Sequence, residues 1–412
     1  MFSTRPLLYG HSLFGLVALK SRSFEELYPV EEGYKRFDQR HTAFGQSLEK
    51  TGRIVGFGAE EYRASKIREG APGFGLVEYA FNGAAGLYEY PPGTTDTQGQ
   101  GFYSWRSLGH VTKPEGVPRW EGSPEEAARI ITKVAKYFGA HSVGFTTLDE
   151  RWFYTHSRYG KPLEFDEEIE EGYVTPEKAV FPLRHKYVIA LTVAMEYEEF
   201  MHAPTQLEVS TNMGYSRMHM LAGQLAEFIR GLGWHATPCG NDTALSVPIA
   251  IQAGLGHAGR HGRLITWDRG PLVRILKVFT DLPLPQSPLA HPGIIDFCEV
   301  CKKCAKHCPA QALPYGPRGY EAVCRANNPG VFKWYGDEEA CLEYWNQVGS
   351  ACSVCFRVCS FTKPPGLVHD VVKWCIRNLP WLNPLWVWLD DALGYGGMKD
   401  PGEYWRKPFK RT

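Results

Sequence analysis

The sequence has no excess of charge of one sign and no long apolar run. Its 412 residues include 45 Lys or Arg and 45 Asp or Glu, so the overall charge does not favour a polyanionic partner such as a nucleic acid. No apolar stretch reaches the roughly 18 residues that a membrane-spanning helix needs. Internal repeats and low-complexity stretches are also absent, which argues against a repeat architecture.

Several common catalytic motifs are missing as well. The sequence has no Walker phosphate-binding loop, no H-E-x-x-H motif and no nucleophile elbow. Gly254, Gly256 and Gly259 imitate a dinucleotide-binding loop, but they follow a predicted helix, and no acidic residue comes at the required distance afterwards. We therefore expect these glycines to let the backbone approach a different, bulky cofactor.

Length and composition indicate a globular chain of two or three domains. Residues 1–115 have weak periodicity, which predicts an irregular segment that wraps a neighbour. Residues 116–290 form a predicted core, and residues 291–365 form a loop-dominated module that holds most of the cysteines. Residues 366–412 are a tail rich in tryptophan. Core packing is expected for this tail, and contact with a membrane surface is the alternative.

The elements of the predicted core can be read from residue patterns. Ser123 and Pro124 begin a helix, apolar residues continue it at helical spacing, and Gly139 ends it. Alternating helices and strands indicate a layered α/β fold. The other predicted elements are strands over 141–148, 186–195, 262–267 and 273–279 and helices over 215–230 and 247–253.

The eleven cysteines are unevenly distributed, since ten of them lie between Cys298 and Cys375. A disulfide scaffold would be small and rich in loops, whereas this chain can bury a large core. Residues 298–309 match the run C-x2-C-x2-C-x3-C-P, which binds 4Fe–4S clusters in two-cluster proteins and sends its last cysteine to the other cluster. Zinc is the alternative, but zinc rarely uses four cysteines so closely spaced.

A second group, "ACSVCFRVCS", begins at Ala351 and supplies three more thiolates. The two-fold pattern assigns to cluster 1 the residues Cys298, Cys301, Cys304 and Cys359. It assigns to cluster 2 the residues Cys308, Cys352 and Cys355 with one further cysteine, for which Cys341 and Cys324 both remain available. We choose Cys341, which is closer along the chain. The cysteines interpreted as buried apolar thiols are Cys239, Cys324 and Cys375.

Several blocks of sequence, taken in order, resemble the corrinoid-dependent reductive dehalogenases. They are "RFDQRHTAF", "GQLAEFIRGLGWHATPCGN", "VPIAIQAGLGHAGRHGRLIT", "GPLVRILKVFTDLPL", "FCEVCKKCAKHCP", "CLEYWNQVGSACSVCFRVC" and "LGYGGMKDPGEYW". The likeness covers most of the chain, and the 215–285 block makes it more specific than the cysteines alone. The sequence departs from the family at Ser360, where a proline is usual, and in showing no export signal.

The resemblance implies a nitroreductase-like core that binds cobalamin with its lower base detached, joined to a bacterial-ferredoxin-like module with two 4Fe–4S clusters. The implied reaction removes halide from an organohalide with two electrons and one proton. The family's catalytic tyrosine matches Tyr215, its supporting asparagine matches Asn241, and its cationic partner matches Arg274. A guanidinium beside the phenol would stabilise the tyrosinate and make it a better acid. Lys277 is the reserve cation.

The resemblance also implies a small organohalide substrate and a low-potential electron donor, allows for a membrane anchor subunit and a homodimer, and implies no nucleic acid. Without a visible signal, a cytoplasmic location is expected; the alternative is the outer face of the cytoplasmic membrane after removal of a twin-arginine signal. An epoxyqueuosine reductase acting on transfer RNA and a cluster-only electron-transfer subunit remain alternative functions. The aromatic residues considered for an apolar pocket, although such residues more often pack in a core, are Trp105, Trp334, Tyr344 and Trp345.

Overall fold

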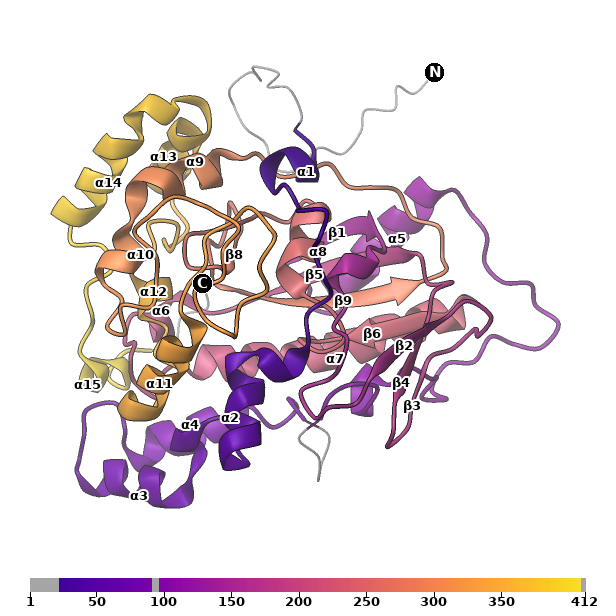
Figure 1. Ribbon diagram of the computed structural model, residues 1–412, viewed down its shortest axis with the longest axis horizontal. Coiled ribbons are helices and arrows are strands. Elements are labelled where there is room, and N and C mark those ends of the chain that lie inside the picture. The colour runs from indigo at the N-terminus through magenta and orange to yellow at the C-terminus, as the bar shows by residue number, and fades with distance from the viewer. Residues whose placement is uncertain (1–21, 91–95, 409–412) are drawn as a thin grey trace.

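The computed structural model describes residues 22–90 and 96–408, and its centre is a four-stranded antiparallel sheet (Figure 1). The strand order is β1-β5-β9-β6, with bounds β1 Ser142–Thr147, β5 Tyr187–Ala194, β9 Val273–Thr280 and β6 Ala236–Cys239. Three of these strands confirm the predictions for 141–148, 186–195 and 273–279. The antiparallel pairing means that helices and strands are mixed without the parallel sheet of a repeated βαβ fold.

Apolar side chains cover both faces of the sheet. On β5, Ile189 and Leu191 pack with helices α5 (Pro124–Tyr137) and α7 (Val209–Gly231), whereas Val188 and Ala190 pack toward α8 (Ser246–Gln252). This alternation explains why the strand reads as a continuous apolar run. Burying one such side chain stabilises the fold by about 1.5–3 kcal/mol, so the position of α7 against β9 is firmly set.

The ends of the core helices follow partly from the sequence. The Ser123 hydroxyl accepts a hydrogen bond from the Glu126 N–H at 3.2 Å, which confirms the predicted start of α5. Helix α7, in contrast, begins at Val209, six residues before the predicted start at Tyr215. No side chain caps its first turn, so the usual Ser, Thr, Asp or Asn signal is missing.

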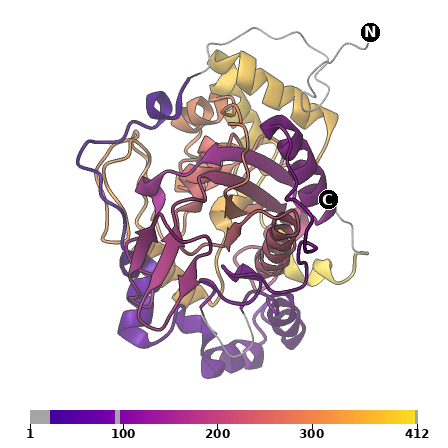
Figure 2. The ribbon, with the colours of Figure 1, turned by 90° about the vertical axis from the view of Figure 1, so that its right-hand side faces the viewer.

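The N-terminal segment is more helical than predicted. It contains α1 (Phe24–Leu27), α2 (Ala43–Thr51), α3 (Glu60–Arg68) and α4 (Leu76–Ala85). The prediction of an irregular segment is therefore wrong for this part of the described chain. The segment does wrap its neighbours, because α4 packs on α7 and α2 packs on α11 (Glu338–Val348). Figure 1 and Figure 2 show α2, α3 and α4 at the end of the molecule opposite α13 and α14, whereas α1 lies at the same end as these two helices.

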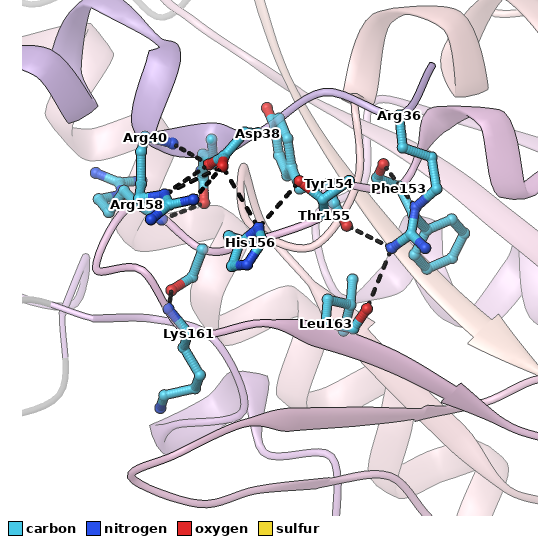
Figure 3. Close-up of polar contacts among 12 residues, drawn as sticks. Arg36, Asp38, Arg40, Phe153, Tyr154, Thr155, His156, Arg158, Lys161 and Leu163 are labelled. Atoms are coloured by element: carbon cyan, nitrogen blue, oxygen red, sulfur yellow. Dashed lines mark hydrogen bonds and ion pairs between the residues drawn. The ribbon is translucent and has the colours of Figure 1, made fainter. Parts of the chain in front are cut away.

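Arg36 holds this segment against the chain between residues 153 and 163 (Figure 3). Its guanidinium donates hydrogen bonds to the carbonyls of Phe153, Tyr154 and Leu163 at 3.4, 2.6 and 3.3 Å. The backbone N–H of Arg158 donates to the Gln39 side chain at 3.0 Å. The block "RFDQRHTAF" thus has a structural role in closing the N-terminal segment over the core.

Two smaller sheets complete the strands. One has the order β2-β4-β3, with bounds β2 Leu163–Asp166, β4 Ala179–Pro182 and β3 Tyr173–Val174, and pairs β2 with β4 in parallel. The sequence patterns did not predict it. The other is the hairpin of β7 (His257–Ala258) and β8 (Leu264–Ile265), which confirms a strand within the predicted range 262–267. The hairpin follows α8, as expected for the glycine-rich stretch.

The cysteine module consists of short helices and turns. Its helices besides α11 are α9 (Gly293–Cys301), α10 (Lys303–Lys306) and α12 (Val354–Arg357), and α6 (Tyr197–Phe200) lies against α12. Lys302, Cys352 and Ser353 adopt positive φ angles of 40°, 57° and 58°. Non-glycine residues seldom adopt this conformation, so the turns that carry cysteines are held by tertiary contacts. The predicted division of the chain into four segments stays a prediction.

The C-terminal tail forms α13 (Leu367–Asn378), α14 (Asn383–Ala392) and α15 (Pro401–Tyr404). Ile376 of α13 is buried against α9, so one face packs on the core as predicted, but the other face does not. The large apolar side chains exposed on α13, on α14 and beside them are Leu367, Val368, Val371, Trp381, Leu385, Trp388 and Leu393. Within residues 22–90 and 96–408, no helix is both long and apolar enough to cross a bilayer.

Candidate active site and cluster-binding cysteines

Tyr215, Asn241 and Arg274 meet at the hydroxyl of the tyrosine. The Asn241 side-chain amide donates a hydrogen bond to Tyr215 Oη at 2.9 Å, and Arg274 Nη1 donates to the same oxygen at 3.2 Å. The Arg274 guanidinium also lies 4.3 Å from the centre of the Tyr215 ring. The three residues predicted from the resemblance are therefore one polar group, although they lie on α7, after β6 and on β9. Its role in catalysis stays a prediction.

Close packing of α7 on β9 creates this group. Arg274 lies on the same face of β9 as the apolar Leu276 and Val278, which pack on the α7 side. At Gly214, the residue before Tyr215, an added Cβ would lie 2.9 Å from Arg274 Cγ. A glycine at this position therefore lets the Arg274 side chain pass close to α7 and reach the face of the Tyr215 ring.

Lys277, the reserve cation, has a different place. Its side chain is fully buried on the opposite face of β9, and Nζ donates hydrogen bonds to the carbonyls of Gly240 and Asp242 and to the Ser246 hydroxyl. Burial lowers the pKa of Lys277. These bonds hold the loop on either side of Asn241, so Lys277 supports the position of the amide and makes no recorded contact with Tyr215.

Glu208 was missed in the sequence and links the phenol site to the cysteine module. It precedes α7, is buried, and accepts a hydrogen bond from the Ala351 N–H at 2.5 Å. Burial raises the pKa of Glu208 to about 8, and the positive charge of Arg274 acts in the opposite direction. A glutamate with a partner 143 residues away leaves no local sequence signal.

The four cysteines predicted for cluster 1 line one cavity. The residues lining it include Cys298, Cys301, Cys304 and Cys359, together with His261 and Ser360. Burial raises the pKa of the Cys304 thiol, and the neighbouring thiolates of Cys298 and Cys359 raise it further. Burial likewise raises the pKa of Cys301, whereas the Ser360 hydroxyl lowers it.

Four cysteines around one cavity are the ligand set that a 4Fe–4S cluster needs. Across the described ranges, no three His, Cys, Asp or Glu side chains are close enough together to hold one metal ion. Zinc would need its four sulfur atoms about 2.3 Å from a common centre, whereas a cube spreads them apart. His261 also lines the cavity; its Nδ1 accepts a hydrogen bond from the Arg263 N–H at 3.2 Å, and its buried Nε2 has no partner among the described residues. A cluster sulfide would accept a hydrogen bond from that nitrogen.

Cluster 2 has its four predicted ligands together as well. Burial raises the pKa of Cys341 to about 11, and the Cys308 thiolate is among the charges that raise it. Burial raises the pKa of Cys355, with further increases from Cys341, Cys352 and Cys308. Burial raises the pKa of Cys324, and the neighbours that also shift it are Ala326 and two glutamates of α11. These interactions support Cys341 over Cys324 as the fourth ligand, and the assignment stays a prediction.

The two sets of cysteines are neighbours. The thiolate of Cys355 in the cluster 2 set is among the charges that raise the pKa of Cys304 in the cluster 1 set. Tyr344 and Trp345 pack beside Cys352 and Cys355, so these two aromatics border the cluster 2 cysteines. Trp105 and Trp334, the other pocket candidates, are buried in the main core.

The three remaining cysteines have different surroundings. Cys239 is fully buried on β6, which confirms the interpretation as an apolar thiol. Cys324 and Cys375 are only partly buried, so that interpretation is wrong for both. Cys324 lies in a turn beside α11, and Cys375 is a half-buried residue of α13.

The structure accounts for Gly254, Gly256 and Gly259 without a cofactor. An added Cβ would lie 2.1 Å from the Pro288 carbonyl oxygen at Gly254, 2.1 Å from that of Ile265 at Gly256, and 2.4 Å from the Ile265 side chain at Gly259. Gly254 also has a φ angle of 77°. Close approach of protein, rather than of a ligand, thus requires these glycines, and corrinoid contact at them stays a prediction.

Arg260, at the end of the same stretch, holds the cluster 1 loop. Its guanidinium is 2% exposed and donates hydrogen bonds to the carbonyls of Cys298, Glu299, Pro314 and Gly316. Sequence reasoning missed this role, because the partners lie 38 to 56 residues further on. An arginine that remains charged while buried needs such a set of acceptors.

Comparisons with known proteins relate this chain to one family. A family model described as "Reductive dehalogenase subunit" matches residues 40–164. A tetrachloroethene reductive dehalogenase of Sulfurospirillum multivorans is 38% identical over 318 residues, which cover 73% of this chain and 62% of that protein. One from Desulfitobacterium hafniense is 34% identical over 366 residues, which cover 78% and 66% of the two chains.

A solved structure gives the same fold. A reductive dehalogenase, presented as suggesting a mechanism for B12-dependent dehalogenation, matches with a TM-score of 0.66 over 90% of this chain and 48% of its own, at 21% identity. Fold and site define a protein of mixed helix and sheet with two sets of four cysteines near a hydrogen-bonded phenol. The chain belongs to the reductive dehalogenase family. It spans 62% and 66% of the length of the two relatives named.

Proposed function

We propose that this chain is a reductive dehalogenase that replaces a halogen of a small organohalide with hydrogen. The balanced reaction takes up two electrons and one proton and releases halide. The observation that carries the proposal is the phenol of Tyr215, which receives hydrogen bonds from Asn241 and Arg274 in a chain that also gathers two sets of four cysteines. The names of the relatives support the same reaction class.

The proposed cofactor is cobalamin with its lower base detached, bound beside Tyr215 on a nitroreductase-like core. Its support among the described residues is a group of buried oxygens that have no hydrogen-bond partner there: Gln206 Oε1, Glu208 Oε2 and Thr211 Oγ1. The amide groups around a corrin ring are donors that would satisfy these acceptors. When bound, cobalamin would supply the two-electron reduction of the carbon–halogen bond.

Tyr215 would supply the proton. A phenol is a weak acid, and the nearby guanidinium of Arg274 stabilises the anion that remains after proton transfer. The Asn241 amide donates to the same oxygen, so it orients the hydroxyl and strengthens this stabilisation. Half-burial of the tyrosine limits competition from water.

Two 4Fe–4S clusters would deliver the electrons one at a time. Cluster 1 would use Cys298, Cys301, Cys304 and Cys359, and cluster 2 would use Cys308, Cys341, Cys352 and Cys355. The loop before Cys352 is bonded to Glu208 at the start of the helix that carries Tyr215. This connection supports cluster 2 as the electron donor nearest to the phenol site.

The electron donor and the cellular location also belong to the proposal. We propose a low-potential donor, a homodimer and a cytoplasmic location; the alternative location is the outer face of the cytoplasmic membrane, where an anchor subunit would hold the protein. The exposed apolar side chains of α13 and α14 support contact with another surface. The prediction about the export signal concerns residues 1–21, which lie outside the described residues. Fractionation of cells and light scattering of the purified protein test location and oligomer.

The test of the function is halide release from a panel of chlorinated and brominated ethenes and phenols, under strict anoxia with a low-potential dye. Release of halide coupled to dye oxidation is expected. A purified protein without corrinoid in its spectrum would favour the cluster-only electron carrier. Activity on an epoxyqueuosine-containing RNA stem-loop, without halide release, would favour the transfer RNA enzyme.

A further inference from the structure

The hydroxyl of Ser360 lies between a predicted cluster 1 ligand and a buried carboxylate. Ser360 Oγ is 3.5 Å from Cys301 Sγ and 3.1 Å from Asp390 Oδ2. Both distances are within hydrogen-bond reach, given the larger radius of sulfur. The cysteine motif usually has proline at this position. A proline has no hydroxyl, so the contact exists because this chain differs from the common motif.

Asp390 is held by two buried lysines. Its carboxylate lies 2.5 Å from Lys303 Nζ and 2.7 Å from Lys363 Nζ, and all three side chains are less than 9% exposed. Lys303 also donates to the Tyr395 carbonyl, so its position is fixed from two directions. The two ammonium groups already satisfy the carboxylate, which therefore does not depend on the serine for a hydrogen-bond donor.

Ser360 has one hydroxyl hydrogen and two acceptors. A cysteine that ligates iron is a thiolate and can only accept, and a carboxylate bonded to two lysines can only accept as well. The hydrogen must therefore be directed to one of the two at any moment. The acceptor that changes is the sulfur, because a cluster that gains an electron places more negative charge on its thiolates.

We propose that Ser360 is a redox-responsive hydrogen-bond donor to cluster 1. Its hydroxyl points to Asp390 when the cluster is oxidised and turns to Cys301 Sγ when the cluster accepts one electron from the low-potential donor. No covalent bond changes and the proton stays on Ser360. The inference rests on the proposed function for the presence of the cluster. It assigns Ser360 as a positioning residue that stabilises the reduced form.

The hydrogen bond should raise the reduction potential of cluster 1. A charge-assisted hydrogen bond changes an equilibrium by roughly tenfold, and a tenfold change corresponds to about 59 mV for a one-electron couple. Cluster 1 would thus accept electrons more readily than with proline at the same position. Lys303 and Lys363 favour the same state through their charge, but they cannot follow the change in redox state as a rotating hydroxyl does.

Ser360→Ala tests the proposal in the anaerobically purified holoenzyme. A redox titration followed by electron paramagnetic resonance should show one of the two cluster potentials shifted downward by about 59 mV, or a tenfold smaller reduced-to-oxidised ratio at fixed potential. Ser360→Pro should shift the same potential in the same direction, and Ser360→Thr should restore it. Thr362→Val is the matched control, since the Thr362 hydroxyl donates to the Phe356 carbonyl in the same loop and the variant keeps the backbone bond from Thr362 to Cys359.

Iron and sulfide analysis separates the two ways of failing. Wild-type protein without two 4Fe–4S clusters would contradict the proposed function itself. Wild-type protein with both clusters, and an Ser360→Ala variant with both clusters at unchanged potentials, would overturn the role of Ser360 alone. A Ser360→Thr variant shifted as far as Ser360→Ala would do the same, because a retained hydroxyl would then have no effect.

Discussion

The phenol site and the cysteine module are built in different ways. Tyr215 and Arg274 lie on α7 and β9, whose apolar residues fill the core on both sides of the sheet. Most of the proposed cluster ligands lie instead on α9, α10 and α12, which have nine, four and four residues, or in turns between them. Packing therefore fixes the first region, whereas the second depends on contacts between loops.

This difference predicts that the two regions fail separately. Buried thiols with raised pKa values must lose their protons to bind a cluster, so cluster assembly and the final order of the module are coupled. In the phenol group, direct hydrogen bonds from Asn241 and Arg274 to Tyr215 join the three side chains. Substitutions of cysteines in the module should lower the iron content and leave the core folded. Substitutions in the phenol group should lower the rate of dehalogenation and leave the clusters bound.

The largest effect is expected for Cys341→Ser, which removes a proposed ligand of cluster 2. Iron and sulfide should fall to roughly half, since one of two cubes needs four thiolates, and turnover should be lost. Circular dichroism should show an intact core. Cys324→Ser is the matched control and should retain all iron. Loss of iron in the Cys324 variant alone would transfer the ligand role to that residue.

Tyr215→Phe should have the opposite pattern. Loss of general-acid help typically slows a reaction about 100- to 10,000-fold, while the ring still fills its space and both clusters stay bound. Corrinoid reduction by a strong chemical reductant should be normal. The control is Tyr187→Phe. Tyr187 pairs with Thr280 at one end of β9, whereas Arg274 of the phenol group pairs with Val193 near the other end. Near-normal dehalogenation by the Tyr215 variant would leave that residue with a packing role only.

Arg274→Met should slow turnover less, by about 10- to 100-fold, because it removes one charge-assisted hydrogen bond to the phenol. Arg274→Lys should recover only part of the rate, since an ammonium cannot stack on the ring as the guanidinium does. Steady-state rates at matched iron and corrinoid content check both. Equal rates for the Met and Lys variants would show that charge at this position does not matter.

The same contrast explains what could be predicted from the sequence. The helix from Ser123 is a signal within about 15 residues, and it was predicted correctly. The first cysteine run is equally local; its four cysteines were found together with part of the second group, and their role as cluster ligands stays a prediction. The phenol group joins positions up to 59 residues apart, so only resemblance to a family pointed to it. Cys341 was chosen over Cys324 because it is closer along the chain; the interaction of Cys341 with Cys308 supports this choice, which stays a prediction.

The features that were missed have physical reasons. Helix α3 has no fully buried residue, so it carries no apolar stripe to detect. The start of α7 lacks a capping side chain, because the Glu208 carboxylate bonds to Ala351 instead. Lys277 and Arg260 both donate hydrogen bonds to carbonyl groups that are distant in the sequence. The sequence does not show which basic residues are buried with such partners, so neither role could be predicted.

The smallest expected effect is on stability, and it concerns a partly exposed ion pair beside the central sheet. His235, between α7 and β6, lies 2.8 Å from Asp281 after β9, and this hydrogen bond raises the pKa of His235 above 6.5. Burial alone would raise the pKa of Asp281, but the bonds from His235 lower it below 3.8. Neighbouring His185 stays neutral in this range, because burial lowers its pKa to about 4.

The sign of the pH dependence follows from the raised pKa of His235. Below pH 6.5 the histidine is charged in both folded and unfolded chains, and the pair contributes fully; as the pH rises through the folded pKa, the contribution is lost. Since His235 is partly exposed, this contribution to stability amounts to about 1 kcal/mol or less.

His235→Asn should therefore lower the urea midpoint at pH 6 and leave it almost unchanged at pH 9, with iron content constant at both. Asp281→Asn should do the same, and the double variant should add little, because either change alone already removes the pair. A midpoint lowered equally at both pH values would mean that His235 acts through packing.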